Sequence, residues 1–315
     1  MLHMTVEPSL PRPAARPLWR RVFPLVLAVV LVAFALGRVD WPTFVTHVLE
    51  LDYLSFFGLM GVFVVALLAA DTLASVRVYR FIIGRVRFRD LLVVRGLSYL
   101  PSLLNHHVGQ AWLTYFLSRR YQAPLARVAG ATLVIYVTWG GCLLLLAAVA
   151  LPAAGLPAQW MAAPVGLGIA YLVLLWLKPK RLLGTRLLGP LFEVGVVGHL
   201  SAMAFRIPHM VLLFLATWLP FRFFGVQIPF DVALASVPVL MVAVTVPLTP
   251  VGLGTRDALA MALFEPYVLA GQTHDARFAA IAAATTSTAV AILVINVLIG
   301  LAMMRIGWRA IDKRE

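Results

Sequence analysis

The chain has 315 residues, of which 62% are hydrophobic and 12% charged, with a mean hydropathy of +0.94 and a formal net charge of +13 at pH 7. This composition excludes an ordinary soluble domain and is typical of a polytopic α-helical membrane protein. The positive charge does not indicate a nucleic-acid partner, because the Lys and Arg residues form short clusters between apolar runs and not a basic face on a soluble module.

Six apolar windows predict membrane spans along the chain. A basic N-terminal segment, residues 1–21, precedes a short first span at 22–36, which we expect to be retained because no small-residue cleavage pattern follows it. Five further windows are near the length that a bilayer requires. They cover residues 54–76, 128–151, 161–177, 198–221 and 277–304. We therefore predict one transmembrane domain over residues 22–304, followed by a basic tail at 305–315.

Two regions between these windows are interrupted by prolines, glycines and polar residues. The first holds the short apolar segments 91–104 and 108–117, and the second holds 232–246 and 255–269. Unwound backbone at membrane depth is tolerated only where it is buried in protein or lines a cavity. We predict two re-entrant hairpins of broken helices. Paired interruptions in the two halves of a chain indicate a transport site near the midplane.

The distribution of positive charge predicts the topology. Most of the 26 Lys and Arg residues fall on one side if the N-terminus is cytoplasmic, which satisfies the positive-inside rule and makes both termini cytoplasmic. Arg95 is then counted in a cytoplasmic segment, and Arg206 is expected to extend to the cytoplasmic interface. The layout is an inverted repeat of residues 54–151 and 198–304. The alternative, in which the hairpin segments span the membrane fully, has the same charge pattern.

The interrupted regions contain two motifs that resemble a known family. The first runs from Pro101 through Gly109-Gln110 and Arg119-Arg120 to Arg127, and the second is Pro247-Leu248-Thr249-Pro250-Val251-Gly252-Leu253-Gly254-Thr255-Arg256-Asp257. They resemble the signatures of the lysylphosphatidylglycerol synthase transmembrane region, also called the flippase-like family. The chain departs from the family pattern at Gln110 and Asp257, where the family has Glu, and at Val251, where it has Gly.

The resemblance implies an integral membrane protein that translocates an anionic or modified phospholipid, or a lipid-linked intermediate. We expect no lipid aminoacylation by this chain, because residues 305–315 are too few for the soluble aminoacyl-transferase domain of the lipid synthases.

The second motif supplies the main candidate for a head-group contact. Arg256 and Asp257 follow a glycine-rich break and would begin a half-helix, whose free N–H groups and positive dipole end attract anions. A guanidinium binds phosphate bidentately, so we predict that Arg256 contacts a lipid phosphate while Asp257 orients it or caps the helix. Alternatively, the two residues only cap the helix and pair near the interface. The predicted substrate-binding set combines both motifs: Arg256, Asp257, Thr249, Gly252, Gly254, Asn105, His106, His107 and Gln110.

Polar residues also mark the tip of the first hairpin and the interior of two spans. Asn105, His106 and His107 would lie on a substrate path or form an interfacial polar tip, and their spacing does not predict a metal site. Asp71, in the second span, needs a partner such as Arg77 or Arg95, in a pair that is either structural or involved in coupling. Asn296, in the last span, is predicted to support close helix packing.

These features favour lipid translocation in the cytoplasmic membrane, with a membrane phospholipid or lipid-linked molecule as the partner and no cofactor or metal. Two alternatives stay open: a non-transporting scaffold for a lipid-modifying enzyme or glycosyltransferase, and a membrane-embedded lipid-modifying transferase. Against the transferase, Asp71 and Asp257 are the only acids at predicted membrane depth and they lie in different halves. The sequence also has no Walker motif for ATP hydrolysis.

Overall fold

The computed structural model describes residues 41–103, 105–153, 157–245, 255–269 and 273–312. Within these ranges the regular elements are helices, apart from one antiparallel bridge between Val226 and Val268. Four helices are long and apolar enough to cross a membrane: α3 (Tyr53–Ile83), α6 (Leu125–Ala153), α9 (Gly189–Trp218, continued by the 3-10 helix η2, Leu219–Phe224) and α12 (His274–Asp312). The chain is therefore an all-α polytopic membrane protein.

The long helices match four of the predicted spans, and α7 (Ala162–Leu177), a shorter apolar helix, matches a fifth. The first predicted span, residues 22–36, lies outside the described residues. Two short helices complete this part of the chain: α2 (Trp41–Leu49), which packs against α12, and α8 (Lys180–Leu183), which links α7 to α9.

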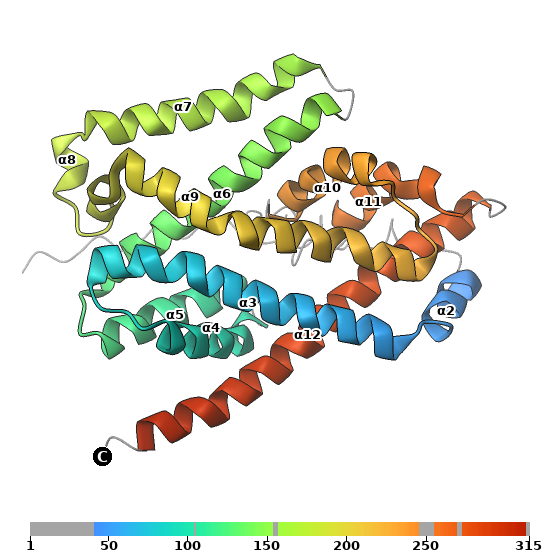
Figure 1. The fold of residues 1–315 in the computed structure, drawn as a ribbon, viewed down its shortest axis with the longest axis horizontal. Helices are drawn as coiled ribbons and strands as arrows, with labels where there is room; N and C mark the ends of the chain where they lie inside the picture. Colours follow the sequence, from blue (N-terminus) through green and yellow to red (C-terminus); the bar gives the residue numbers. More distant parts are fainter. Residues whose placement is uncertain (1–40, 104, 154–156, 246–254, 270–272, 313–315) are drawn as a thin grey trace, which may run out of the picture.

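Short helices stand where the two hairpins were predicted, α4 (Phe88–Ser102) with α5 (His106–Arg120), and α10 (Phe230–Thr245) with α11 (Thr255–Phe264). A helix of 15 residues, such as α4, is about 22 Å long, which is less than the ~30 Å apolar core of a bilayer. The first pair begins and ends beside the end of α3 and turns back near the middle of the molecule, and the second pair enters from the opposite end (Figure 1). Both pairs are therefore helical hairpins with arms too short for a full span, and their re-entrant placement in the membrane stays a prediction.

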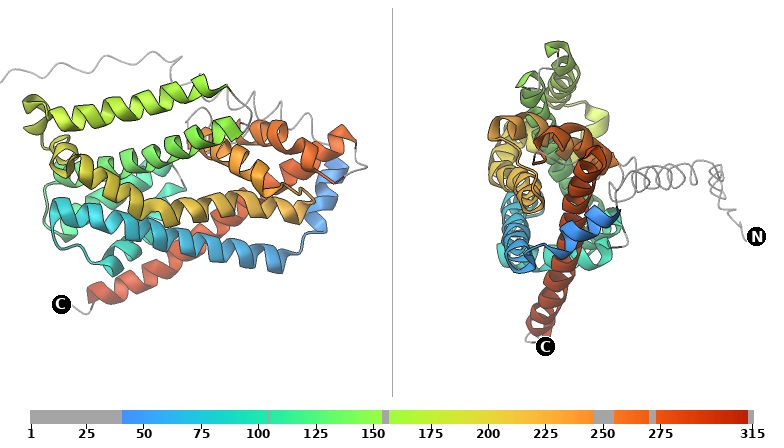
Figure 2. Two further views of the ribbon diagram at one scale, coloured as in Figure 1. Left: turned by 45° about the horizontal axis from the view of Figure 1, so that its top comes forward. Right: turned by 90° about the vertical axis from the view of Figure 1, so that its right-hand side faces the viewer.

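The packing repeats itself between the two halves of the chain. α4 packs against α12 just as α10 packs against α6, and α6 packs against α9 just as α12 packs against α3. α5 lies on α6 and α11 lies on α12, while α3 and α9 pair with each other. Each hairpin thus contacts the last long helix of the other half. Figure 2 shows the same arrangement from two further directions, with α12 crossing the molecule and its C-terminal end projecting from the bundle. The helix contacts of the two halves thus correspond pairwise, as the predicted inverted repeat requires.

Glycines permit the closest of these contacts. A Cβ added to Gly96 would lie 2.7 Å from Cγ of Met303, and one added to Gly300 would lie 2.6 Å from Cγ of Leu100, so α4 and α12 cross at two glycines. Inside the first hairpin, a Cβ at Gly109 would lie 2.7 Å from the carbonyl oxygen of Ser98. Small residues let helix backbones approach closely in a membrane, where packing and not water exclusion drives association.

Two apolar clusters occupy the two ends of the bundle and leave a polar layer between them. On α3, Phe56 and Met60 belong to one cluster and Tyr79 and Ile82 to the other. Asp71 lies between these two groups along the helix and is buried. On α9, Arg206 lies between Ala202 of one cluster and Met210 of the other. Asp71 and Arg206 are therefore held between the two apolar ends of the bundle.

Cys142 belongs to the first of these clusters and its Sγ lies 3.8 Å from the carbonyl oxygen of Met203. It is a packing residue.

Candidate functional site

Three charged side chains meet in the polar layer. Asp71 on α3 accepts a hydrogen bond of 2.8 Å through Oδ1 from Nη1 of Arg206 on α9, and its Oδ2 lies 2.9 Å from Nε of Arg95 on α4. The side chains of Asp71, Arg95 and Arg206 are 10%, 22% and 2% exposed. We call these three residues the ion cluster. Because a buried charge is costly unless it is paired, each member depends on the others.

The ion cluster combines parts of both repeats. Asp71 and Arg95 come from the first repeat and Arg206 from the second, 135 residues away from Asp71 along the chain. Two guanidinium groups share one carboxylate, so the cluster carries a net positive charge at neutral pH. The excess charge is available to an anion.

A small polar cavity adjoins the ion cluster. Asp71, Arg95 and, on α5, Gln110 line it. The space has room for about one water molecule. The other lining residues come from α3 to α6: Thr72, Ser75, Tyr79, Leu91, Leu113, Thr132 and Ile135. In this conformation a ligand larger than a water molecule enters only if the surrounding helices move apart.

Hydroxyl groups form one wall of this cavity. The hydroxyl oxygen of Tyr79 lies 2.9 Å from Oγ1 of Thr132, which in turn lies 3.1 Å from Oγ1 of Thr114. Thr114 donates to the carbonyl oxygen of Gln110 at 2.8 Å. The hydroxyls connect α3, α5 and α6 and keep the wall polar, which suits an anionic or hydrated ligand.

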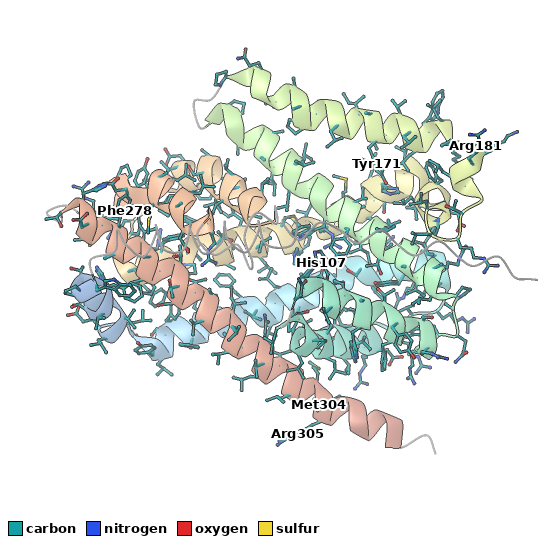
Figure 3. The ribbon with its side chains drawn as sticks, turned by 180° about the vertical axis from the view of Figure 1, so that it is seen from behind. His107, Tyr171, Arg181, Phe278, Met304 and Arg305 are labelled. Atoms are coloured by element: carbon teal, nitrogen blue, oxygen red, sulfur yellow. The ribbon has the colours of Figure 1, made fainter. Side chains whose placement is uncertain are left out.

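The tip of the first hairpin lies beyond the cavity, one turn before Gln110. Asn105 caps the N-terminus of α5, and its side-chain oxygen accepts a hydrogen bond of 2.8 Å from the backbone N–H of His107. Nε2 of His106 lies 3.2 Å from the hydroxyl of Tyr136 on α6. All three tip residues, Asn105, His106 and His107, are exposed, and Figure 3 shows His107 near the centre of the molecule. Of the predicted residues in this hairpin, Gln110 is the one that lines the cavity.

The predicted residues of the second hairpin have other partners. Arg256, at the start of α11, donates through Nη2 to the carbonyl oxygen of Thr285 on α12 at 2.5 Å, and its Nε lies 3.6 Å from Oδ1 of Asp257. The bond to Thr285 ties α11 to α12, whereas the contact with Asp257 lies within α11. The role of Arg256 as a phosphate contact stays a prediction. Thr249, Gly252 and Gly254 lie outside the described residues, and Asn296 is half-buried on α12.

The expectation for one arginine was wrong. Arg206 does not extend to an interface: its side chain is 2% exposed and bonded to Asp71, because its position on α9 faces α3 and not the lipid. Arg95, which was counted with the cytoplasmic charges, lies on α4 within the first predicted hairpin and reaches Asp71. The predicted pairing of Asp71 with Arg95 is confirmed, whereas Arg77 instead places its Cζ 3.6 Å from the ring centroid of Phe205.

The hydroxyl wall and the role of Arg206 were not predicted from the sequence. The available signal was a charged residue inside an apolar window: Arg206 lies within the predicted span 198–221, as Asp71 lies within another. Two opposite charges in separate spans can satisfy each other.

Comparisons with models of protein families, with curated proteins and with solved structures found no match. Among the described residues, no group of three or more His, Cys, Asp or Glu side chains is placed to hold a metal ion.

Proposed function

We propose that this protein translocates an anionic or modified phospholipid, or a lipid-linked phosphate, across the cytoplasmic membrane. The observation that carries the proposal is the guanidinium of Arg95, which lines a cavity within the first repeat beside Asp71, the residue that Arg206 of the second repeat bonds. In transporters with inverted repeats, the substrate site lies at the repeat interface, and one repeat moves against the other to change which side is open.

The chemistry of the cavity supports an anionic head group. A planar guanidinium donates two parallel hydrogen bonds to a phosphate, and Gln110 and the hydroxyl of Tyr79 can bond further oxygens of a head group. The acyl chains need no protein cavity, because they can remain in the surrounding lipid while the head group crosses.

The orientation follows from charge in this proposal. Basic residues gather at the end of the bundle where α3 ends and α4 begins, including Arg80, Arg85, Arg87 and Arg89. The positive-inside rule places this end in the cytoplasm. The first hairpin then enters from the cytoplasmic side, the second hairpin from the outside, and both termini are cytoplasmic.

The test is head-group accessibility of labelled phosphatidylglycerol in proteoliposomes that contain the purified protein. Arg95→Gln should abolish movement of the lipid, and Arg95→Lys should retain a small fraction of it, because Lys keeps the charge but lacks the planar fork. Arg119→Gln is the matched control: Arg119 is an exposed arginine on the same hairpin, with its Nε 3.2 Å from the hydroxyl of Tyr115.

The alternatives give different results in the same experiment. Wild-type rates in a folded Arg95→Gln protein would remove Arg95 from the site. A wild-type protein that consumes the lipid would support the transferase, and one that neither moves nor alters lipid but co-purifies with a lipid-modifying enzyme would support the scaffold. Arg256→Gln in the same assay tests the predicted phosphate contact in the second hairpin.

A further inference from the structure

The two arginines of the ion cluster differ in their access to the cavity. Arg206 is almost completely buried and does not line the cavity, whereas Arg95 is 22% exposed and lines it beside Asp71. A ligand in the cavity therefore meets Arg95 and not Arg206. Asp71 holds both arginines, one through each carboxylate oxygen.

The carboxylate of Asp71 occupies a position on Arg95 that a phosphate oxygen would take. Carboxylate and phosphate present similar oxygen acceptors to a guanidinium. A bound phosphate can thus replace Asp71 as the partner of Arg95, while Asp71 keeps the hydrogen bond of 2.8 Å to Arg206. After this exchange each guanidinium still has an anionic partner: the phosphate for Arg95 and Asp71 for Arg206.

The charge of the ion cluster limits which anion fits best. With His209, one turn along α9 from Arg206, in its neutral form, the two guanidinium groups and one carboxylate sum to one positive charge. A singly charged phosphodiester brings this sum to zero. A doubly charged phosphomonoester leaves an excess negative charge in a buried site, where uncompensated charge is costly.

We infer, on the basis of the proposed function, that Asp71 is a resident competitor for Arg95: it pairs with Arg95 in the empty protein and yields to a singly charged phosphodiester head group. Competition weakens binding of the lipid and speeds its release. Removal of Asp71 should therefore tighten binding and slow turnover.

The test uses a double variant that keeps the net charge of the ion cluster at one positive charge. Asp71→Asn alone leaves Arg206 buried without its partner, whereas Asp71→Asn/Arg206→Gln removes both charges and leaves Arg95 in the cavity. Asp90→Asn is the control. Asp90 lies 3.5 Å from Arg120 and accepts a hydrogen bond of 3.0 Å from the hydroxyl of Tyr121, and it does not line the cavity. Thermal unfolding in detergent checks the fold of each variant.

The probes are glycerophosphoglycerol, a phosphodiester, and glycerol 3-phosphate, a phosphomonoester, titrated against purified protein in detergent. The double variant should bind the phosphodiester about tenfold more tightly than wild type or Asp90→Asn, and it should bind the phosphomonoester less tightly than the phosphodiester. In proteoliposomes, both the KM for labelled phosphatidylglycerol and the kcat should fall.

Unchanged affinity in the folded double variant would overturn the competition, and tighter binding of the phosphomonoester would overturn the charge argument. If wild type moves the lipid while the double variant shows no change in affinity or KM, the inference fails and the proposed function stands. If wild type moves no lipid but the double variant binds the phosphodiester tenfold more tightly, the proposed function fails and the anion site stands.

Discussion

Arg206 has a side chain that is only 2% exposed, and its hydrogen bond to Asp71 joins the two repeats. Removing one partner of a buried ion pair leaves the other charge uncompensated, at a cost of about 3–5 kcal/mol. Arg206→Gln should therefore lower the thermal unfolding midpoint in detergent, and the added substitution Asp71→Asn should restore much of the loss. Arg77→Gln, an exposed arginine that stacks on Phe205, is the control. Equal midpoints for Arg206→Gln and Arg77→Gln would contradict a structural role of the pair.

The sequence predicted some of the contacts in this site and missed others. A carboxylate at membrane depth requires a cation, so the pairing of Asp71 with a nearby arginine followed from the sequence. The contribution of Arg206 did not, because the position of a residue in a span gives its depth but not the helix that it faces. Arg95 was placed with the cytoplasmic charges for a related reason: the depth to which a hairpin enters the membrane is set by tertiary packing.

Glycine positions decide how closely the arms of the first hairpin approach. A Cβ at Gly109 would lie 1.8 Å from Oγ of Ser102 and 2.7 Å from the carbonyl oxygen of Ser98. The serine side chain can rotate, but the backbone carbonyl cannot, so Gly109→Ala should separate α4 from α5 and cost about 1–3 kcal/mol. The measurement is the thermal unfolding midpoint.

Gly140→Ala is the matched control, because a Cβ at Gly140 in α6 meets nothing within 4 Å and Ala is the better helix former. It should leave stability unchanged or raise it. A Gly109→Ala protein as stable as Gly140→Ala would show that the hairpin accommodates the added methyl group.

The boundaries of the helices were well predicted where a residue in the sequence marks the end of a helix. Asn105 caps α5 and sets its start at His106, close to the predicted 108, and α11 begins at Thr255 as expected. Helix α11 ends at Phe264 and not at 269, because Pro266 lies in the 3-10 turn that follows. Helix α12 runs past the predicted limit of 304 to Asp312, since hydropathy marks the apolar part of a helix and not its polar continuation.

For the whole molecule, the order of spans and hairpins predicted the inverted repeat, but not its contacts. Each hairpin packs on the last long helix of the other repeat, α4 on α12 and α10 on α6. These contacts depend on which face of each helix carries the small residues, such as Gly96 and Gly300. An inverted repeat allows several such pairings, and only close packing in three dimensions selects one.

The depth of the first hairpin provides the last prediction. In a Cys142→Ala background, Leu103→Cys places a thiol at the tip, Arg119→Cys near the base of the same hairpin, and Gln227→Cys before α10 at the opposite end; all three positions are exposed. A membrane-impermeant thiol reagent should label position 119 only from the cytoplasmic side and position 227 only from outside. Position 103 should react slowly from either side, because a re-entrant tip ends inside the membrane. If position 103 reacts from outside as fast as position 227, α4 and α5 cross the membrane completely, and the cavity beside Gln110 then lies between full spans.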